Sequence, residues 1–103
     1  MRNDRRLATS DEIGAVCAQH AGWSVADGKL HREYRFPSFV AAFGFMASAA
    51  LIAERMNHHP DWANVYNRVT VDLHTHDMGG ISPDDLALAS AMEGIAMGLV
   101  HAE

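Results

Sequence analysis

Apolar positions along the chain follow two different periods, and together these predict its helices and strands. Apolar residues recur at helical spacing in segments 10–20, 39–56 and 83–101. Segments 23–25, 30–36, 61–66 and 69–75 are short, and their apolar and polar residues tend to alternate, which is typical of strands. Both strand pairs are joined by short turns. We therefore expect a two-layer α+β domain, with a four-stranded, mainly antiparallel sheet and three helices packed on one face.

Local signals indicate where several of these elements begin and end. Thr9 with Glu12 three residues later fits a capping box at the start of the first helix. Asp27-Gly28 is a strong signal for a two-residue hairpin turn, and Asn67-Arg68 is expected to form the second turn. Ser82-Pro83-Asp84-Asp85 combines a cap, a proline at the first helical position and acids at the positive end of the helix dipole.

The same patterns predict which side chains are buried. In the second strand, Tyr34, Phe36 and the stem of Arg32 are predicted to share one face. In the fourth strand, the predicted core face holds Val69, Val71, Leu73 and Thr75, and the opposite face holds Thr70, Asp72, His74 and His76. The first helix is expected to bury Ile13, Val16 and Cys17, and the last helix Leu86, Ala89, Met92, Ala96, Leu99 and Val100.

The helix 39–56 is more apolar than one buried face requires. No charged residue occurs from Phe36 to Ala53, a length that approaches the roughly 20 residues needed to span a bilayer. Pro37 and Ser38 open this segment, and glycine, serine and alanine dilute it, so we interpret it as a buried or interface helix. Its apolar residues cover more than one face. We therefore expect it to contact the sheet and a partner, most simply a second subunit.

Bulk composition excludes several other classes of protein. A length of 103 residues, with 49% apolar and 20% charged residues, is typical of one globular domain, here 1–103 with 1–8 as a loose lead-in. The net charge of -5 and the lack of a basic run beyond Arg2, Arg5 and Arg6 argue against nucleic-acid binding. The single cysteine, Cys17, excludes an internal disulfide and a thiolate zinc site. No signal peptide is apparent, so we expect a cytoplasmic location.

Candidate chemistry is concentrated around His58-His59-Pro60. The chain has seven histidines, and four of them lie between His58 and His76. Pro60 disfavours helical geometry at His59, so the preceding helix should stop just before the pair and leave two imidazoles on a loop. Histidine has the side-chain pKa nearest neutral pH, which suits it to proton transfer.

Three interpretations of the histidines remain open from the residues alone. A metal site could use the nitrogens of His58, His59, His74 and His76. Ordinary structural or solvated histidines are the second interpretation, and it is favoured for His20, His31 and His101. The third is metal-free acid–base catalysis, in which two or three imidazoles surround a small pocket.

Neighbouring residues could support such a pocket. Glu54 lies one helical turn before His58, so its carboxylate could orient an imidazole or bind a polar edge of a ligand. Asp85 could act in the same way, or serve only as an acid at the helix dipole. Trp62 could form a wall for a flat ligand, although its position alone favours core packing.

A longer series of motifs runs through the chain in a fixed order. It comprises Gly22-Trp23, Asp27-Gly28, Phe39, Ala42–Met46, Glu54-x-x-x-His58-His59-Pro60, Trp62, Asn64–Asn67, Thr75-His76, Gly80–Ser82, Asp85 and Leu88-Ala89. Together these residues resemble the pterin-4a-carbinolamine dehydratase family, and the resemblance covers Ile13 to Met97.

The resemblance implies an antiparallel sheet with helices on one face and assembly into dimers or tetramers. It also implies dehydration of 4a-hydroxytetrahydropterin to quinonoid dihydropterin, with no metal and no organic cofactor. Since that substrate is the product of aromatic amino acid hydroxylases, a functional link to such an enzyme in tetrahydrobiopterin recycling is implied too.

Carried over residue by residue, the resemblance implies a catalytic trio of His58, His59 and His76. We predict that His58 and His76 form the acid–base pair and that His59 has a positioning role. The expected substrate contacts are Glu54, Pro60, Trp62, Thr75, Asp77, Met78 and Asp85. The alternative hypothesis is a protein-binding or dimerisation module that uses the apolar segment 39–53.

Overall fold

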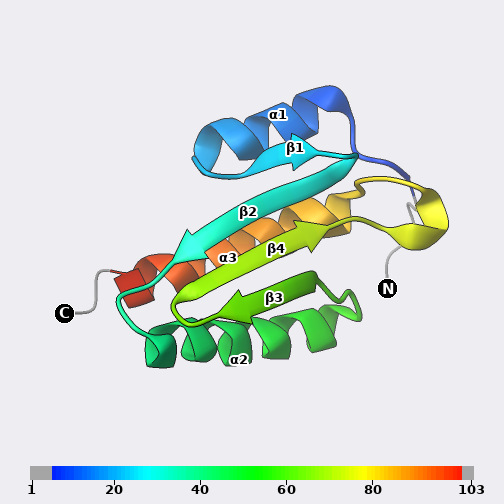
Figure 1. Ribbon diagram of the computed structural model, residues 1–103. Coiled ribbons are helices and arrows are strands. Elements are labelled where there is room, and N and C mark those ends of the chain that lie inside the picture. The colour runs from blue at the N-terminus through cyan, green and yellow to red at the C-terminus, as the bar shows by residue number, and fades with distance from the viewer. Residues whose placement is uncertain (1–5, 101–103) are drawn as a thin grey trace.

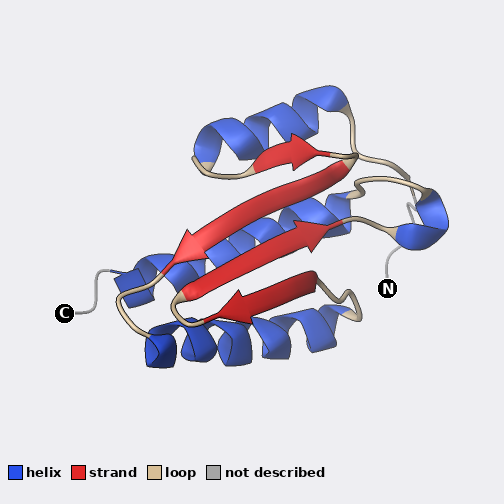
Figure 2. Ribbon diagram, in the orientation of Figure 1, coloured by secondary structure: helices blue, strands red, loops and turns tan. Residues whose placement is uncertain are grey.

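The computed structural model describes residues 6–100, and these contain the predicted order of helices and strands together with one short 3-10 helix. In chain order the elements are α1 (Ser10–Gln19), β1 (Ser24–Ala26), β2 (Lys29–Arg35), α2 (Phe39–Met56), β3 (Asp61–Val65), β4 (Arg68–Leu73), η1 (His76–Met78) and α3 (Pro83–Val100). Figure 1 labels them along the chain, and Figure 2 distinguishes helices, strands and loops. Residues 1–5 of the predicted lead-in, and His101, lie outside the described residues.

The strands form one sheet in the order β1-β2-β4-β3, and every neighbouring pair is antiparallel. The two hairpins therefore meet along β2 and β4 at the centre of the sheet. Figure 1 shows α3 behind the sheet, with α1 and α2 alongside it. The predicted two-layer α+β fold, with helices covering one face of an antiparallel sheet, is confirmed.

Alternation along β4 directs one face of the sheet toward the helices. Val69, Val71 and Leu73 are buried, whereas the residues between them are only partly buried. Phe45 of α2 and Met92 of α3 are fully buried in the same apolar cluster. This buried area supplies the main driving force for folding.

A partly buried polar contact fixes α3 against the sheet. Glu93 of α3 accepts hydrogen bonds from the Tyr34 hydroxyl at 2.8 Å and from Trp23 Nε1 at 3.1 Å. Burial and the bond to Glu93 both raise the pKa of the Tyr34 phenol, so it remains a donor. The Arg32 guanidinium stacks over the Tyr34 ring, 4.1 Å from its centroid, as expected for side chains on one face.

The first hairpin and the first helix begin as the sequence predicts. Asp27 and Gly28 form the two-residue loop between the paired residues Ala26 and Lys29. Both loop residues have positive φ, 54° and 74°, as a type I′ turn requires. The Thr9 capping box is complete, with both of its hydrogen bonds to Glu12 present.

The second hairpin turn was predicted one residue too late. Val65 pairs with Arg68, so the loop is Tyr66-Asn67, and β3 ends before Tyr66. Tyr66 has a positive φ of 54°, which is unusual for a residue with a Cβ. The side chain of Asn64 supports the turn by donating to the carbonyl oxygens of Tyr66 and Arg68 at 3.1 and 2.9 Å.

The end of β4 also differs from the prediction. The strand stops at Leu73, and Thr75 forms only an isolated bridge to Gly80. His76–Met78 form η1 instead of continuing the polar face of the strand. The cause is local: the Thr75 carbonyl accepts from the amides of Met78 and Gly79, and Gly79 closes the turn with a φ of 72°.

Other boundaries need smaller corrections. Trp23 precedes β1 and lies in the core, and Phe36 follows β2 while remaining buried. Ile13, Val16 and Cys17 of α1 are partly rather than fully buried, because α1 covers only the margin of the core. The stripe predicted on α3 is largely buried, although Leu99 is only partly so and the side chain of Val100 lies outside the described residues.

The predicted lead-in is held to the domain where it is described. Ala8 donates its backbone N–H to the carbonyl of Ile81 at 2.8 Å. Arg6 forms two side-chain hydrogen bonds with Glu12, both 2.8 Å long. Residues 6–8 are therefore not loose.

Helix α2 combines a buried face with an exposed apolar face. Ala42, Phe45, Ala49 and Ala53 are buried and form the face toward the domain. The opposite side exposes the large apolar side chains of Phe39, Val40, Phe43 and Leu51. By length and mean hydropathy, 1.5, α2 is apolar enough to cross a membrane, but core helices of soluble proteins satisfy the same criteria.

Candidate active site

The predicted catalytic loop begins where α2 ends. The helix stops at Met56, and Asn57 adopts the left-handed conformation with φ 54° and ψ 44°. The backbone N–H of His58 still bonds the carbonyl of Ala53, at 3.0 Å, so the turn is closed before the chain leaves the helix. Helix termination just before the histidine pair is confirmed, and Asn57 provides the left-handed turn.

His58 is held by a buried carboxylate. Its Nε2 atom lies 2.5 Å from Oδ1 of Asp85, whose side chain is 0% exposed while that of His58 is 12% exposed. Oδ2 of Asp85 accepts from the Thr75 hydroxyl at 2.9 Å and from the backbone N–H of Ser82 at 2.8 Å. Three donors thus offset the cost of burying this carboxylate.

Local sequence explains why Asp85 can do this. It lies in the first turn of α3, three residues after Ser82, so its carboxylate reaches back to the backbone N–H that precedes the helix, as the acid of a capping box does. Asp85 therefore has both of the roles that were considered for it. It completes the start of the helix, and it also orients an imidazole.

His59 has a different environment. Its Nε2 atom lies 2.9 Å from Oε1 of Glu54, and the two side chains are 59% and 81% exposed. Glu54 was expected either to orient an imidazole or to bind a polar edge of a ligand. It does contact an imidazole, but the ring is that of His59. The adjacent imidazoles point to different carboxylates.

His76 lies on η1 and is exposed. Its Nδ1 atom is 3.2 Å from Nε2 of His74, with the two ring centroids 4.0 Å apart. Among the described residues, no group of three or more His, Cys, Asp or Glu side chains has an arrangement suited to a metal ion.

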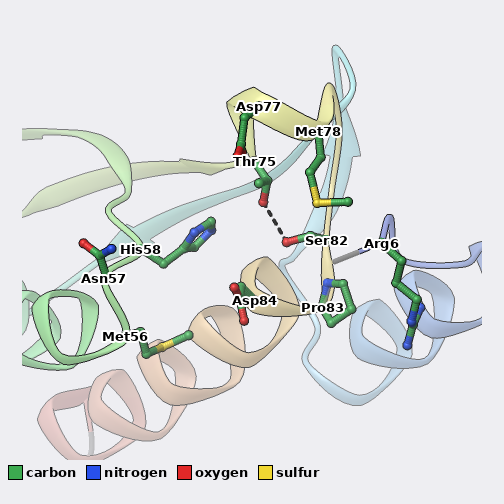
Figure 3. Close-up of a pocket in the computed structure, with 10 residues that line it drawn as sticks. All are labelled: Arg6, Met56, Asn57, His58, Thr75, Asp77, Met78, Ser82, Pro83 and Asp84. Carbon is green, nitrogen blue, oxygen red and sulfur yellow. Dashed lines mark hydrogen bonds between the residues drawn. The ribbon is translucent and has the colours of Figure 1, made fainter. Parts of the chain in front are cut away.

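A cavity of about 400 Å³ lies beside His58. Figure 3 shows the residues that line it, from the end of α2, the η1 turn, the start of α3 and the N-terminal segment. They are Arg6, Met56, Asn57, His58, Thr75, Asp77, Met78, Ser82, Pro83 and Asp84. In Figure 3 the imidazole of His58 points toward Thr75 and Ser82 across this space.

The cavity brings together only some of the predicted residues. His58, Thr75, Asp77 and Met78 line it, and Asp85 lies immediately behind His58. The remaining candidates are not among its lining residues: Glu54, His59, Pro60, Trp62 and His76. Trp62 is partly buried and packs near Phe45, with ring centroids 6.5 Å apart, which favours the core role considered for it.

The lining also contains residues that sequence reasoning did not select. Ser82 was considered as a helix cap and as part of the Gly80–Ser82 motif, yet its side chain is buried and its Oγ lies 2.6 Å from Oγ1 of Thr75. Arg6 was assigned to a loose lead-in. Its hydrogen bonds to Glu12 had no sequence signal, because residues 6–9 precede the helix and follow no regular period.

An imidazole that is oriented by a buried carboxylate beside a small polar cavity is suited to proton transfer. An ionised carboxylate only accepts hydrogen bonds, so Nε2 of His58 carries its proton toward Asp85 and Nδ1 is left for exchange. This is the arrangement by which a carboxylate fixes the tautomer of a general acid or base.

Comparison with known proteins gives the family. A family model described as pterin 4 alpha carbinolamine dehydratase matches residues 6–95. The chain belongs to this family. It is therefore related to dehydratases that act on pterins, as the motif resemblance indicated.

Several relatives in the pterin 4 alpha carbinolamine dehydratase family match over nearly their whole length. A protein of Solibacter usitatus that carries this dehydratase name provisionally is 53% identical over 90 residues, which cover 87% of this chain and 95% of the relative. A Rhizobium etli protein with the same provisional name is 46% identical over 98 residues, 93% of this chain and 95% of the relative.

A solved structure shares the fold. The crystal structure described as a transcriptional coactivator/pterin dehydratase from Brucella melitensis has a TM-score of 0.82 and 42% sequence identity to this chain. The match covers 88% of this chain and 99% of that one. The site described above thus occurs in a chain that belongs to the pterin 4 alpha carbinolamine dehydratase family and is similar in fold to this solved structure.

Proposed function

We propose that this chain dehydrates a 4a-hydroxytetrahydropterin to quinonoid dihydropterin and water, with its own histidine side chains as acid and base. The observation that carries the proposal is the His58–Asp85 pair at the wall of the cavity. The carboxylate engages Nε2–H, so Nδ1 is the nitrogen through which His58 exchanges a proton with the substrate.

The reaction needs one proton delivered and one removed. The bond from C4a to the hydroxyl oxygen breaks, and that oxygen takes up a proton and leaves as water. The adjacent ring nitrogen loses its proton as the carbon–nitrogen double bond forms. An imidazolium can supply the first proton and a neutral imidazole can accept the second, and proton exchange with water then returns both rings to their starting states.

We assign these two roles to His58 and His76, with His59 as a positioning residue. The location of His76 on η1 supports this assignment, because its chain neighbours Thr75 and Asp77 both line the cavity. A ligand in the cavity would lie beside η1. We infer substrate contacts from the backbone at Thr75 and from Asp77 and Met78, which line the cavity, and the family resemblance adds Glu54, Pro60 and Trp62, which are not among its lining residues.

A direct assay tests the proposal. Freshly generated 4a-hydroxytetrahydropterin should dehydrate faster with the chain than without it, and both His58→Ala and His76→Ala should reduce the enzymatic rate. An unchanged rate with the wild-type chain would contradict the dehydratase function. Full activity in both variants would leave the function in place but refute the acid–base assignment.

We further propose that the physiological reaction belongs to tetrahydrobiopterin recycling and follows an aromatic amino acid hydroxylase. The support is the family of the chain, whose name specifies the pterin carbinolamine. Coupled assays test this: the chain should increase the turnover of such a hydroxylase when its pterin is present in limiting amount.

A second proposal concerns self-association through α2. Phe39, Val40 and Phe43 are 48%, 77% and 58% exposed, and with Gly44 they line an apolar groove. A groove lined by exposed large apolar side chains is typical of an interface, and burying it would stabilise a dimer or tetramer. The related Brucella protein is described also as a transcriptional coactivator, so a different protein partner is the alternative occupant.

Light scattering separates these possibilities. The chain should be a homo-oligomer, and Val40→Glu should convert it to a smaller species because a charge would be buried in the interface. Val25→Glu, at a 53% exposed apolar position of β1, is the matched control and should leave the mass unchanged. A wild-type monomer would contradict self-association.

A further inference from the structure

A chain of hydroxyl groups lies behind the His58–Asp85 pair. Thr75 Oγ1 is 2.9 Å from Oδ2 of Asp85 and 2.6 Å from Oγ of Ser82. Ser82 is 4% exposed and Asp85 is 0% exposed, so bulk water does not compete strongly for these contacts.

The direction of each hydrogen bond follows from counting protons. Each hydroxyl has a single proton, and an ionised carboxylate can only accept. Thr75 must therefore donate its proton to Asp85. In the short contact between the two hydroxyl groups Thr75 is then the acceptor, so Ser82 is the donor. The result is a directed series from Ser82 to Thr75 to Asp85, with His58 donating to the same carboxylate from the other side.

This series restrains the plane of the Asp85 carboxylate. Oδ2 is held by the Thr75 hydroxyl and by the backbone N–H of Ser82, which leaves Oδ1 directed at Nε2 of His58. The three contacts come from β4's extension, the start of α3 and the end of α2, which are far apart in the sequence. A carboxylate with one fewer donor could rotate and release the imidazole.

We propose that Thr75 and Ser82 are positioning residues, whose hydroxyl groups act through Asp85 to fix the tautomer and orientation of His58. This inference rests on the proposed function of His58 as an acid–base group. It deepens that function by assigning the Thr75 side chain to Asp85, and by giving Ser82 a role beyond helix capping.

The test replaces hydroxyl groups without changing shape. Thr75→Val keeps the β-branched side chain but removes the donor, and it should lower kcat about tenfold with KM changed less than about twofold. Thr75→Ser restores the hydroxyl and should restore kcat. Thr70→Val makes the same chemical change on the other face of β4 and is the matched control. Ser82→Ala should lower kcat by a smaller factor, about threefold, because Thr75 can still donate to Asp85.

Nitrogen-15 NMR of His58 provides a readout without substrate. In the wild-type chain the neutral ring should show a protonated Nε2 and a bare Nδ1, and Thr75→Val should move both signals toward the averaged values of an exchanging imidazole.

If Thr75→Val leaves the signals and kcat unchanged, or if Thr75→Ser behaves like Thr75→Val, the inference is wrong. If Ser82→Ala changes neither the NMR signals nor kcat, the positioning role of Ser82 is wrong. If Thr75→Val does not fold, Ser82→Ala provides the test in its place. A wild-type chain without dehydratase activity would refute the proposed function, while the NMR signals would still decide the hydrogen-bond series.

Discussion

His58 and His59 are adjacent in the chain, and each pairs with a carboxylate through Nε2, yet their surroundings differ. The His58–Asp85 side chains are 12% and 0% exposed, whereas those of His59 and Glu54 are 59% and 81% exposed. Two further protein donors hold Asp85, while Glu54 lies on the exposed surface of α2. The first pair is a fixed internal unit, and the second is a solvated contact on the surface.

The difference shows that pairing alone does not identify a catalytic histidine. Exposed ion pairs contribute about 0–1 kcal/mol, because water screens them and long side chains lose entropy on pairing. A buried carboxylate must be satisfied by donors, so removal of one donor or of the charge has larger consequences. The comparison therefore predicts that equivalent changes will have unequal effects at the two pairs.

The largest difference is expected in catalysis. His58→Ala should lower kcat about 100- to 10,000-fold, the usual contribution of a general acid or base. His59→Ala should lower it by less than about tenfold, because a positioning role leaves the proton-transfer group in place. Steady-state rates with 4a-hydroxytetrahydropterin measure both variants. Equal losses in the two variants would remove the distinction between the pairs.

The next difference is expected in stability. Asp85→Asn should lower the free energy of unfolding by about 1–3 kcal/mol, because an amide cannot accept from all three donors and places its own N–H₂ near one of them. Glu54→Gln is the matched change at the exposed pair and should stay within about 0.5 kcal/mol of the wild-type chain. Urea unfolding at neutral pH provides both values. A loss at Glu54 as large as that at Asp85 would contradict the comparison.

A double-mutant cycle measures the coupling energy within each pair, which we expect to be smaller at the exposed pair. The coupling energy between Glu54 and His59, from the two single alanine variants and the double variant, should be below about 1 kcal/mol and should decrease in high salt. The same cycle for His58 and Asp85 should give a larger coupling that changes less with salt. A salt-insensitive coupling at the exposed pair would indicate that it is more restrained than its exposure implies.

Local sequence signals accounted for the order of elements but not for every boundary. Asp27-Gly28 predicted its turn correctly because both residues tolerate positive φ. Tyr66 could not be predicted in that conformation, since the pairing of β3 with β4 and the Asn64 side chain impose it. The η1 turn was missed for the same reason, because contacts between Thr75 and Gly80 outweigh the apparent alternation of β4.

The candidate site was predictable in its residue types and less so in its contacts. His58 and Asp85 were both selected from sequence, but their partnership depends on how the end of α2 meets the start of α3. Spacing within one helix suggested Glu54 as a partner for an imidazole, and the left-handed Asn57 helps explain why that imidazole is His59 rather than His58. Ser82 was missed because a cap signal explained it fully at the level of local sequence.

The smallest predicted effect concerns Glu12, an exposed carboxylate that pairs with Arg6 instead of a histidine. Unlike an imidazole, the guanidinium of an arginine stays charged over the whole pH range. Arg6 and the backbone N–H of Thr9 lower the pKa of Glu12 from 4.5 to about 2. Because the pKa is lower in the folded chain, the contribution of Glu12 to stability is fully present above about pH 4.5 and is lost as the pH falls through about 2.

Glu12→Gln keeps a side chain that suits the capping box but removes this charge. Urea unfolding between pH 7 and pH 2 should therefore show the wild-type advantage over Glu12→Gln shrinking below pH 4.5, whereas Asp11→Asn, in the same helical turn, controls for the helix dipole. An advantage over Glu12→Gln that stays constant down to about pH 2 would show that the carboxylate charge, and hence its pairing with Arg6, does not stabilise the N-terminal wall of the cavity.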